Sequence, residues 1–106
     1  MPKSSAFRPF SLAAQRFNVS DTVQTVTLPD NPGYTSTADV TAWVDNRGYT
    51  DLLIEVGSST PSDTLSYPLP AQSSQPISVG LERTIKIKRP ASSAAGLVIV
   101  TAGEGL

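Results

Sequence analysis

The sequence predicts one all-β domain built as a single antiparallel β-sandwich, and three observations predict it. The chain has 106 residues, which suits one core of ordinary size. Nine prolines and seven glycines interrupt it at short intervals. Between these breaks, aliphatic and β-branched residues alternate with polar ones, as in strands that have one buried face.

The first fifteen residues are interpreted as an extended N-terminal arm. Two prolines interrupt strand pairing there, and Phe7 and Phe10 do not alternate with polar residues as strand residues do. We therefore divide the chain into an arm at residues 1–15 and a β-sandwich domain at residues 16–106. An arm with two phenylalanines is expected to dock on its own domain or on another molecule.

Alternation and turn signals then predict the strands of the domain in order. Pro68 and Pro70 place one short strand at a sheet edge, because proline cannot donate a ladder hydrogen bond. The predicted elements are strands at 16–19, 22–28, 65–69 and 97–101, one hairpin between 38 and 56, and a second hairpin between 77 and 87.

The first hairpin turns at Asp45-Asn46-Arg47-Gly48, where Gly48 is expected to take a positive φ. Its register sets Ala42 opposite Leu52, within one apolar face. The only tryptophan, Trp43, then lies on the reverse face opposite Asp51. We expect that reverse face to be covered either by the arm, through Phe7 or Phe10, or by another molecule.

The second hairpin would set Val79 opposite Ile87 and Leu81 opposite Ile85. Lys86 and Lys88 would then project from the same face at a sheet edge, where they either prevent aggregation or bind an acidic partner. Two apolar faces and seven or so short strands describe a sandwich of jelly-roll or immunoglobulin-like type.

The residue types argue against catalysis. The chain has no cysteine and no histidine, so it lacks thiol nucleophiles, imidazole bases and the usual zinc ligands. The predicted hairpin brings one carboxylate pair together, Asp39 and Glu55. That pair is a solvated repulsive pair, the acceptor of a salt bridge, or a metal or acid–base site. We expect no enzyme, no cofactor and no metal site.

Charge and hydropathy limit the other partners. Residues 1–20 carry three basic side chains and no acidic one, whereas residues 21–82 carry eight acidic side chains and a single basic one, Arg47. A nucleic-acid site would need a basic stripe with stacking aromatics, and neither hairpin offers one. The N-terminus lacks the apolar core of a secretory signal, and the longest apolar run is far shorter than the roughly 20 residues that span a bilayer. We expect neither nucleic-acid nor membrane binding.

Four stretches of the chain, 44–48, 52–59, 67–71 and 98–106, resemble small capsid decoration (cement) proteins of tailed bacteriophages. The shared layout is an N-G turn, a strand ending in Gly-Ser, a Pro-rich connector and a terminal Gly-Glu-Gly. It covers most of the chain after about residue 38. This chain departs from the pattern by the insertion of Arg47 in the turn, and its arm matches no pattern of the family.

The resemblance implies a non-enzymatic structural protein of the virion, made in the host cytoplasm and bound to the outer capsid surface. Its partners would be the major capsid protein and other copies of itself, as a homotrimer, without a small-molecule substrate. Under this interpretation two sets of residues bind partners. Coat protein or an adjacent protomer would contact Phe7, Arg8, Phe10 and Arg16, and a subunit interface would include Trp43, Tyr49 and Leu53.

Two alternatives from other classes stay open. A receptor- or carbohydrate-binding module of a phage tail or fibre would use the same sandwich, with Tyr34, Tyr49 and Trp43 as the stacking residues. A head-to-tail joining protein is the other structural alternative, and it would differ in its copy number per virion.

Overall fold

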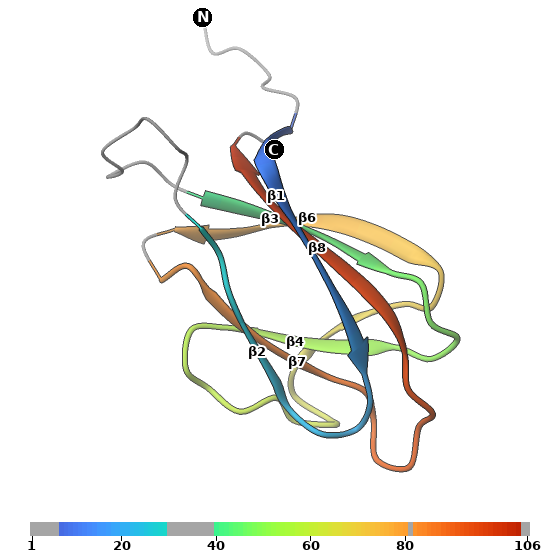
Figure 1. Ribbon diagram of the computed structural model, residues 1–106. Helices are drawn as coiled ribbons and strands as arrows, with labels where there is room; N and C mark the ends of the chain where they lie inside the picture. Colours follow the sequence, from blue (N-terminus) through green and yellow to red (C-terminus); the bar gives the residue numbers. More distant parts are fainter. Residues whose placement is uncertain (1–6, 30–39, 81, 105–106) are drawn as a thin grey trace, which may run out of the picture.

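The computed structural model describes residues 7–29, 40–80 and 82–104, and it confirms the all-β sandwich. Two four-stranded antiparallel sheets, in the orders β1-β8-β3-β6 and β2-β7-β4-β5, pack face to face (Figure 1). The strands are β1 (Arg8–Val19), β2 (Gln24–Thr27), β3 (Val40–Asn46), β4 (Leu52–Val56), β5 (Tyr67–Leu69), β6 (Ser73–Gly80), β7 (Thr84–Lys88) and β8 (Gly96–Glu104).

The strand pairing is that of a jelly roll. β1 pairs with β8, β2 with β7, β3 with β6 and β4 with β5, all antiparallel. This is the result of rolling one long hairpin into two sheets. From β1 to β4, each strand therefore lies in the opposite sheet from the strand that precedes it. The order distinguishes the jelly roll from the immunoglobulin-like alternative.

Both predicted hairpins are wrong in their pairing. β3 pairs with β6 and β8, whereas β4 pairs with β5 and β7, so the chain crosses from one sheet to the other between 46 and 52. Likewise, Val79 lies in β6 of one sheet and Ile87 in β7 of the other, and Leu81 lies outside the described residues. A turn between two apolar runs looks the same in the sequence whether the chain returns beside the first strand or across the core.

The predicted inward faces are confirmed for most of their residues. These side chains are buried in one core, where they meet across the sandwich instead of lying side by side. Val56 is the exception at 38% exposed, and Ala38 and Leu81 lie outside the described residues. The buried core residues are Phe10, Ala13, Val19, Val26, Leu28, Val40, Ala42, Val44, Leu52, Ile54, Leu69, Val79, Ile85, Ile87, Val98, Val100 and Ala102.

The N-terminal segment departs from the sequence expectation. β1 begins at Arg8, so residues 8–15, which the sequence assigns to the arm, pair with the last strand instead. Between Pro9 and Ala14 the register shifts, so that residues 10–13 oppose a single residue of β8. Phe10 points into the core at this bulge. The proline is tolerated because β1 is an edge strand.

Two predictions about sheet edges have opposite outcomes. The proline-bearing strand β5 is an edge strand, as expected. The edge position predicted for Lys86 and Lys88 is wrong, because β7 lies between β2 and β4 in the middle of its sheet. A proline marks an edge through its missing N–H group, whereas lysine carries no such backbone constraint.

A buried arginine holds one end of the sandwich together. Arg89 Nε donates to the carbonyl oxygen of Val19 at 2.9 Å, and Nη1 donates to that of Thr50 at 2.8 Å. Burial lowers the pKa of Arg89 below its ordinary value. Gly48 is not at positive φ, contrary to the sequence expectation. A glycine is needed there because a Cβ would lie 2.3 Å from Arg89 Nη2.

Candidate functional site

Trp43 lies on the outer face of the β1-β8-β3-β6 sheet. Its neighbours Ala42 and Val44 point into the core, so the intervening side chain points the other way. This outward orientation is the one expected from the sequence, but the neighbours differ. Trp43 lies opposite Pro76 of β6 and Thr101 of β8, not opposite Asp51.

Phe7 packs on Trp43 at this face. The two ring centroids lie 5.4 Å apart with the planes inclined by 39°, within the range of favourable aromatic pairs. The ring of Phe7 also lies over Gly103 of β8, where a Cβ would approach it to 2.5 Å. Of the two coverings left open by the sequence, the structure shows the chain's own Phe7.

An ion pair completes the contact between the first and the last strand. Arg8 Nη2 lies 2.7 Å from Glu104 Oε1, and both side chains are exposed. Exposed pairs of this kind contribute about 0–1 kcal/mol, so it mainly aligns the strand ends. Gly103 and Glu104 thus serve the docking of Phe7 and Arg8.

Beside the aromatic pair lies a groove of about 440 Å³, which we call the Trp43 groove. The described residues that line it are apolar or aromatic apart from one hydroxyl, and none of them is ionisable. Such a lining can bind an apolar side chain or the face of a planar ring, but it has no group for proton transfer. The lining residues are Phe7, Pro9, Trp43 and Thr101.

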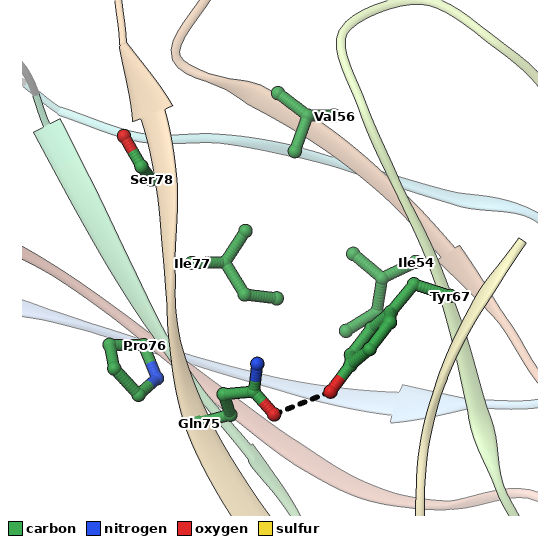
Figure 2. A pocket seen from close by; sticks show the side chains of 7 residues that line it. All are labelled: Ile54, Val56, Tyr67, Gln75, Pro76, Ile77 and Ser78. Carbon is green, nitrogen blue, oxygen red and sulfur yellow. Dashed lines mark hydrogen bonds between the residues drawn. The ribbon is translucent and has the colours of Figure 1, made fainter.

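A second concavity, of about 300 Å³, opens between the two sheets where β5 and β6 form the edge of the sandwich, and we call it the edge pocket (Figure 2). Ile54 and Ile77 approach one another across it, and Tyr67 Oη lies 2.5 Å from Gln75 Oε1. This hydrogen bond links the two sheets. The lining residues are Ile54, Val56, Tyr67, Gln75, Pro76, Ile77 and Ser78.

The edge pocket results from unequal strand lengths. β5 has three residues, whereas β6, which borders the same edge of the sandwich, has eight. β5 pairs with β4 only as far as Ile54, so Val56 at the end of β4 has no neighbour in β5. Its side chain is 38% exposed beside the pocket.

Over β4 and β7, the outer face of the other sheet is covered by the chain itself. The loop 57–66 is tied to it by Ser66 Oγ, which donates to Glu55 Oε2 at 2.6 Å, and by an ion pair of 2.6 Å between Lys88 and Asp63. The ammonium of Lys88, followed by the backbone N–H of Ala91, holds the pKa of the Asp63 carboxyl below its ordinary value.

The predicted carboxylate pair is not brought together by the hairpin that was to form it. Glu55 lies opposite Lys86 of β7 and accepts from Ser66, while Asp39 lies outside the described residues. Among residues 7–29, 40–80 and 82–104, no three His, Cys, Asp or Glu side chains are grouped so that they could hold a metal ion.

The structure separates the residues predicted to bind partners. Leu53 is 3% exposed on the outer face of the other sheet, so it shares no surface with Trp43. Phe10 belongs to the core, and Arg8 is paired with Glu104. Tyr49 is 89% exposed in the loop before β4, and Arg16 is exposed on β1. Within the predicted set, the rings of Phe7 and Trp43 are in contact with each other.

Sequence reasoning missed Pro9 and Thr101 as neighbours of Trp43, and it missed the edge pocket. The Gly-Glu pair at 103–104 could have indicated that a ring packs beside Trp43, because a glycine near the end of a strand leaves room for a large side chain. Nothing local in the sequence indicates the edge pocket, since Tyr67 and Gln75 come from different sheets.

No family model, no curated protein and no solved structure matches this chain. None of the described segments is a helix with the length and apolar character needed to cross a membrane. The proposals for function therefore depend on the surfaces described above and on the resemblance found in the sequence.

Proposed function

We propose that this chain is a non-enzymatic virion protein of the capsid decoration kind. It binds the outer surface of a phage head, as a homotrimer and in many copies, and it stabilises contacts between coat subunits. The observation that carries the proposal is the Trp43 groove, an aromatic surface on one face of a jelly roll whose described lining residues carry no ionisable group. The resemblance in the sequence supplies the class of partner.

The groove has the composition of a protein-binding site. The cores of protein interfaces are enriched in Trp and Phe and depleted of charges. Trp43 and Phe7 supply the aromatic area, and the contact of Phe7 with Gly103 holds the ring in place before any partner arrives. A surface arranged in advance loses less conformational entropy on binding.

Repetition would supply the rest of the affinity. A single groove of this size makes a modest contact, but copies joined in a symmetric oligomer engage neighbouring coat subunits together. Arg16 and Tyr49 are exposed and remain free to contact a partner outside the groove. Phe10 and Leu53 are buried within the chain, so the proposed interface no longer includes them.

Co-sedimentation with expanded, undecorated phage capsids tests the proposal. The wild-type protein should sediment with the shells in hundreds of copies, as expected of a trimer repeated over a shell. Trp43→Ala should weaken binding about thirtyfold, the size typical of a central interface residue. Leu65→Ala is the control, because Leu65 is an exposed apolar side chain outside the groove.

The outcomes separate the alternatives. If the wild type ignores capsids but binds a neutral glycan, and Trp43→Ala abolishes that binding, the chain is a carbohydrate-binding module. A small fixed number of copies at one position of the head would indicate a joining protein. Equal capsid binding by wild type and a folded Trp43→Ala variant would contradict the role of the groove.

A further inference from the structure

We infer that copies of this chain associate edge to edge, with Leu12 of one copy seated in the edge pocket of the next. The inference rests on the part of the proposed function in which copies associate, and it is independent of capsid binding. It uses the two edges of the β1-β8-β3-β6 sheet, and not the outer face that carries the Trp43 groove.

Leu12 is the projecting side chain. It lies in the bulge of β1 between Pro9 and Ala14, and it is 102% exposed. Its φ is 55°, a left-handed conformation that disfavours leucine and that glycine or asparagine would adopt more readily. The fold of a single copy therefore gains nothing from a leucine here, whereas an interface gains an apolar anchor.

The edge pocket offers the complementary cavity. Ile54, Val56 and Ile77 give it aliphatic walls, and the described residues of its lining include no Asp, Glu, Lys or Arg. Its volume of about 300 Å³ lies at the lower limit of small-molecule pockets, which suits the insertion of a side chain. Tyr67 and Gln75 provide polar atoms at the sheet-bridging hydrogen bond, as at the margin of an interface.

The positions of Leu12 and the edge pocket require two copies. β1 and β6 are the two opposite edges of one sheet, so a copy cannot fill its own pocket. Both strands also present unpaired backbone groups at these edges, which can pair between copies. Residues 67–80 contain no charged side chain, so nothing there repels the exposed Arg16 of β1.

The contact is heterologous, because two different patches meet. Such a contact joins copies head to tail and either closes into a ring or continues as a filament. A ring of three would be the homotrimer of the proposed function. A second copy is thus the occupant to which the inference commits, and a small neutral molecule is the competing occupant.

Complementation between two variants tests the inference. Leu12→Asp removes the inserted side chain and leaves the pocket intact, whereas Val56→Trp fills the pocket and leaves Leu12 intact. In sedimentation velocity across a range of concentrations, each variant alone should associate at least about tenfold more weakly than wild type, as expected for an apolar side chain lost from an interface. Mixed, the two should form a one-to-one heterodimer, because one Leu12 and one open pocket remain.

Two controls keep the result specific. Leu65→Asp puts the same charge at another exposed leucine, in the loop 57–66 and 86% exposed, and should leave association unchanged. Circular dichroism and thermal unfolding verify that Val56→Trp is folded. Because the chain has no cysteine, a mixture of Leu12→Cys and Val56→Cys should form one intermolecular disulfide under mild oxidation, and neither variant alone should form this mixed pair.

Three results would overturn the inference: a wild type that stays monomeric at millimolar concentration, an oligomer that survives Leu12→Asp, or a mixture that never forms the heterodimer. A monomer whose pocket instead binds a neutral sugar, with Val56→Trp blocking the sugar, would also overturn it. Capsid co-sedimentation of wild type and of Trp43→Ala reports on the proposed function separately, because Trp43→Ala changes neither Leu12 nor a lining residue of the edge pocket.

Discussion

The two outer faces of the sandwich differ in what covers them. On the β2-β7-β4-β5 sheet, the loop 57–66 is fastened by polar contacts, Ser66 to Glu55 and Asp63 to Lys88, and Leu53 is buried. On the β1-β8-β3-β6 sheet, two aromatic rings pack together beside an apolar groove. One face is thus covered over β4 and β7 by the chain's own loop, and the other keeps an apolar concavity at its surface.

The difference shows how a small sandwich can separate stability from binding. A face closed by hydrogen bonds and an ion pair presents little apolar area to a partner. A face whose aromatic pair is held by Gly103 presents such area in a defined shape. Both faces depend on the same core and on the same end of the sandwich, where Arg89 lies.

The largest expected loss of stability comes from replacing Arg89, at the end of the sandwich that both faces depend on. Arg89→Leu removes the donors to the carbonyl oxygens of Val19 and Thr50. The Val19 oxygen is left in a buried site, whereas the Thr50 oxygen keeps the hydrogen bond from Asn46 Nδ2. We expect the free energy of unfolding to fall by about 3 kcal/mol, measured by urea denaturation. The matched control is Arg16→Leu, at an exposed arginine of β1, which should change stability by less than about 0.5 kcal/mol.

The next largest loss of stability should be confined to the outer face of the β1-β8-β3-β6 sheet. In Gly103→Ala the new Cβ would lie 2.4 Å from the carbonyl oxygen of Arg8 and 2.5 Å from the ring of Phe7, so the start of β1 must shift. We expect a loss of about 1–3 kcal/mol and a change in the emission of Trp43, the only tryptophan.

A double variant separates the ring from the backbone contact. Phe7→Ala in the Gly103→Ala background should recover part of the stability, because one of the two clashes is removed. Unchanged emission of Trp43 in a folded Gly103→Ala variant would contradict the packing described for this face.

The smallest loss of stability should be confined to the outer face of the β2-β7-β4-β5 sheet and should depend on pH. The pKa of Asp63 is lower in the folded chain than in the unfolded one, so the unfolded state binds the proton more tightly. The stabilisation by its ion pair is therefore present at pH 7 and is lost as the pH falls below about 4 and through the folded value. Asp63→Asn should accordingly be less stable than wild type at pH 7, and the difference should shrink at pH 3.

A double-mutant cycle checks the cause of that pH dependence. In a Lys88→Met background, Asp63→Asn should cost less stability than it does in the wild type, because the ion pair is already absent. The same cost in both backgrounds would assign the effect to the hydrogen bond from Ala91 instead.

The alternation of Ala42, Trp43 and Val44 was sufficient to predict which side chains enter the core and which point outward, and the structure confirms it. This pattern depends only on the geometry of one strand, in which successive side chains point to opposite sides. The sandwich could be predicted for the same reason, since several such strands need a second layer to cover them.

The partners of each strand could not be predicted in this way. Ala42 and Leu52 point into the core both in a hairpin and in the jelly roll. Their spacing in the sequence therefore does not show whether their strands pair within one sheet or pack across the core in two sheets. The Trp43 groove likewise needs Phe7 and Thr101, which stand at opposite ends of the chain.

Local sequence patterns were therefore enough to predict the all-β class, the inward and outward faces of the strands, and a chain without cysteine or histidine chemistry. Tertiary structure alone decided which strands pair, that Phe7 covers Trp43, and that unequal edge strands leave a pocket near Tyr67. The reason is physical: the orientation of a side chain follows from local backbone geometry, whereas strand pairing depends on contacts between distant segments that form only when the whole core is assembled.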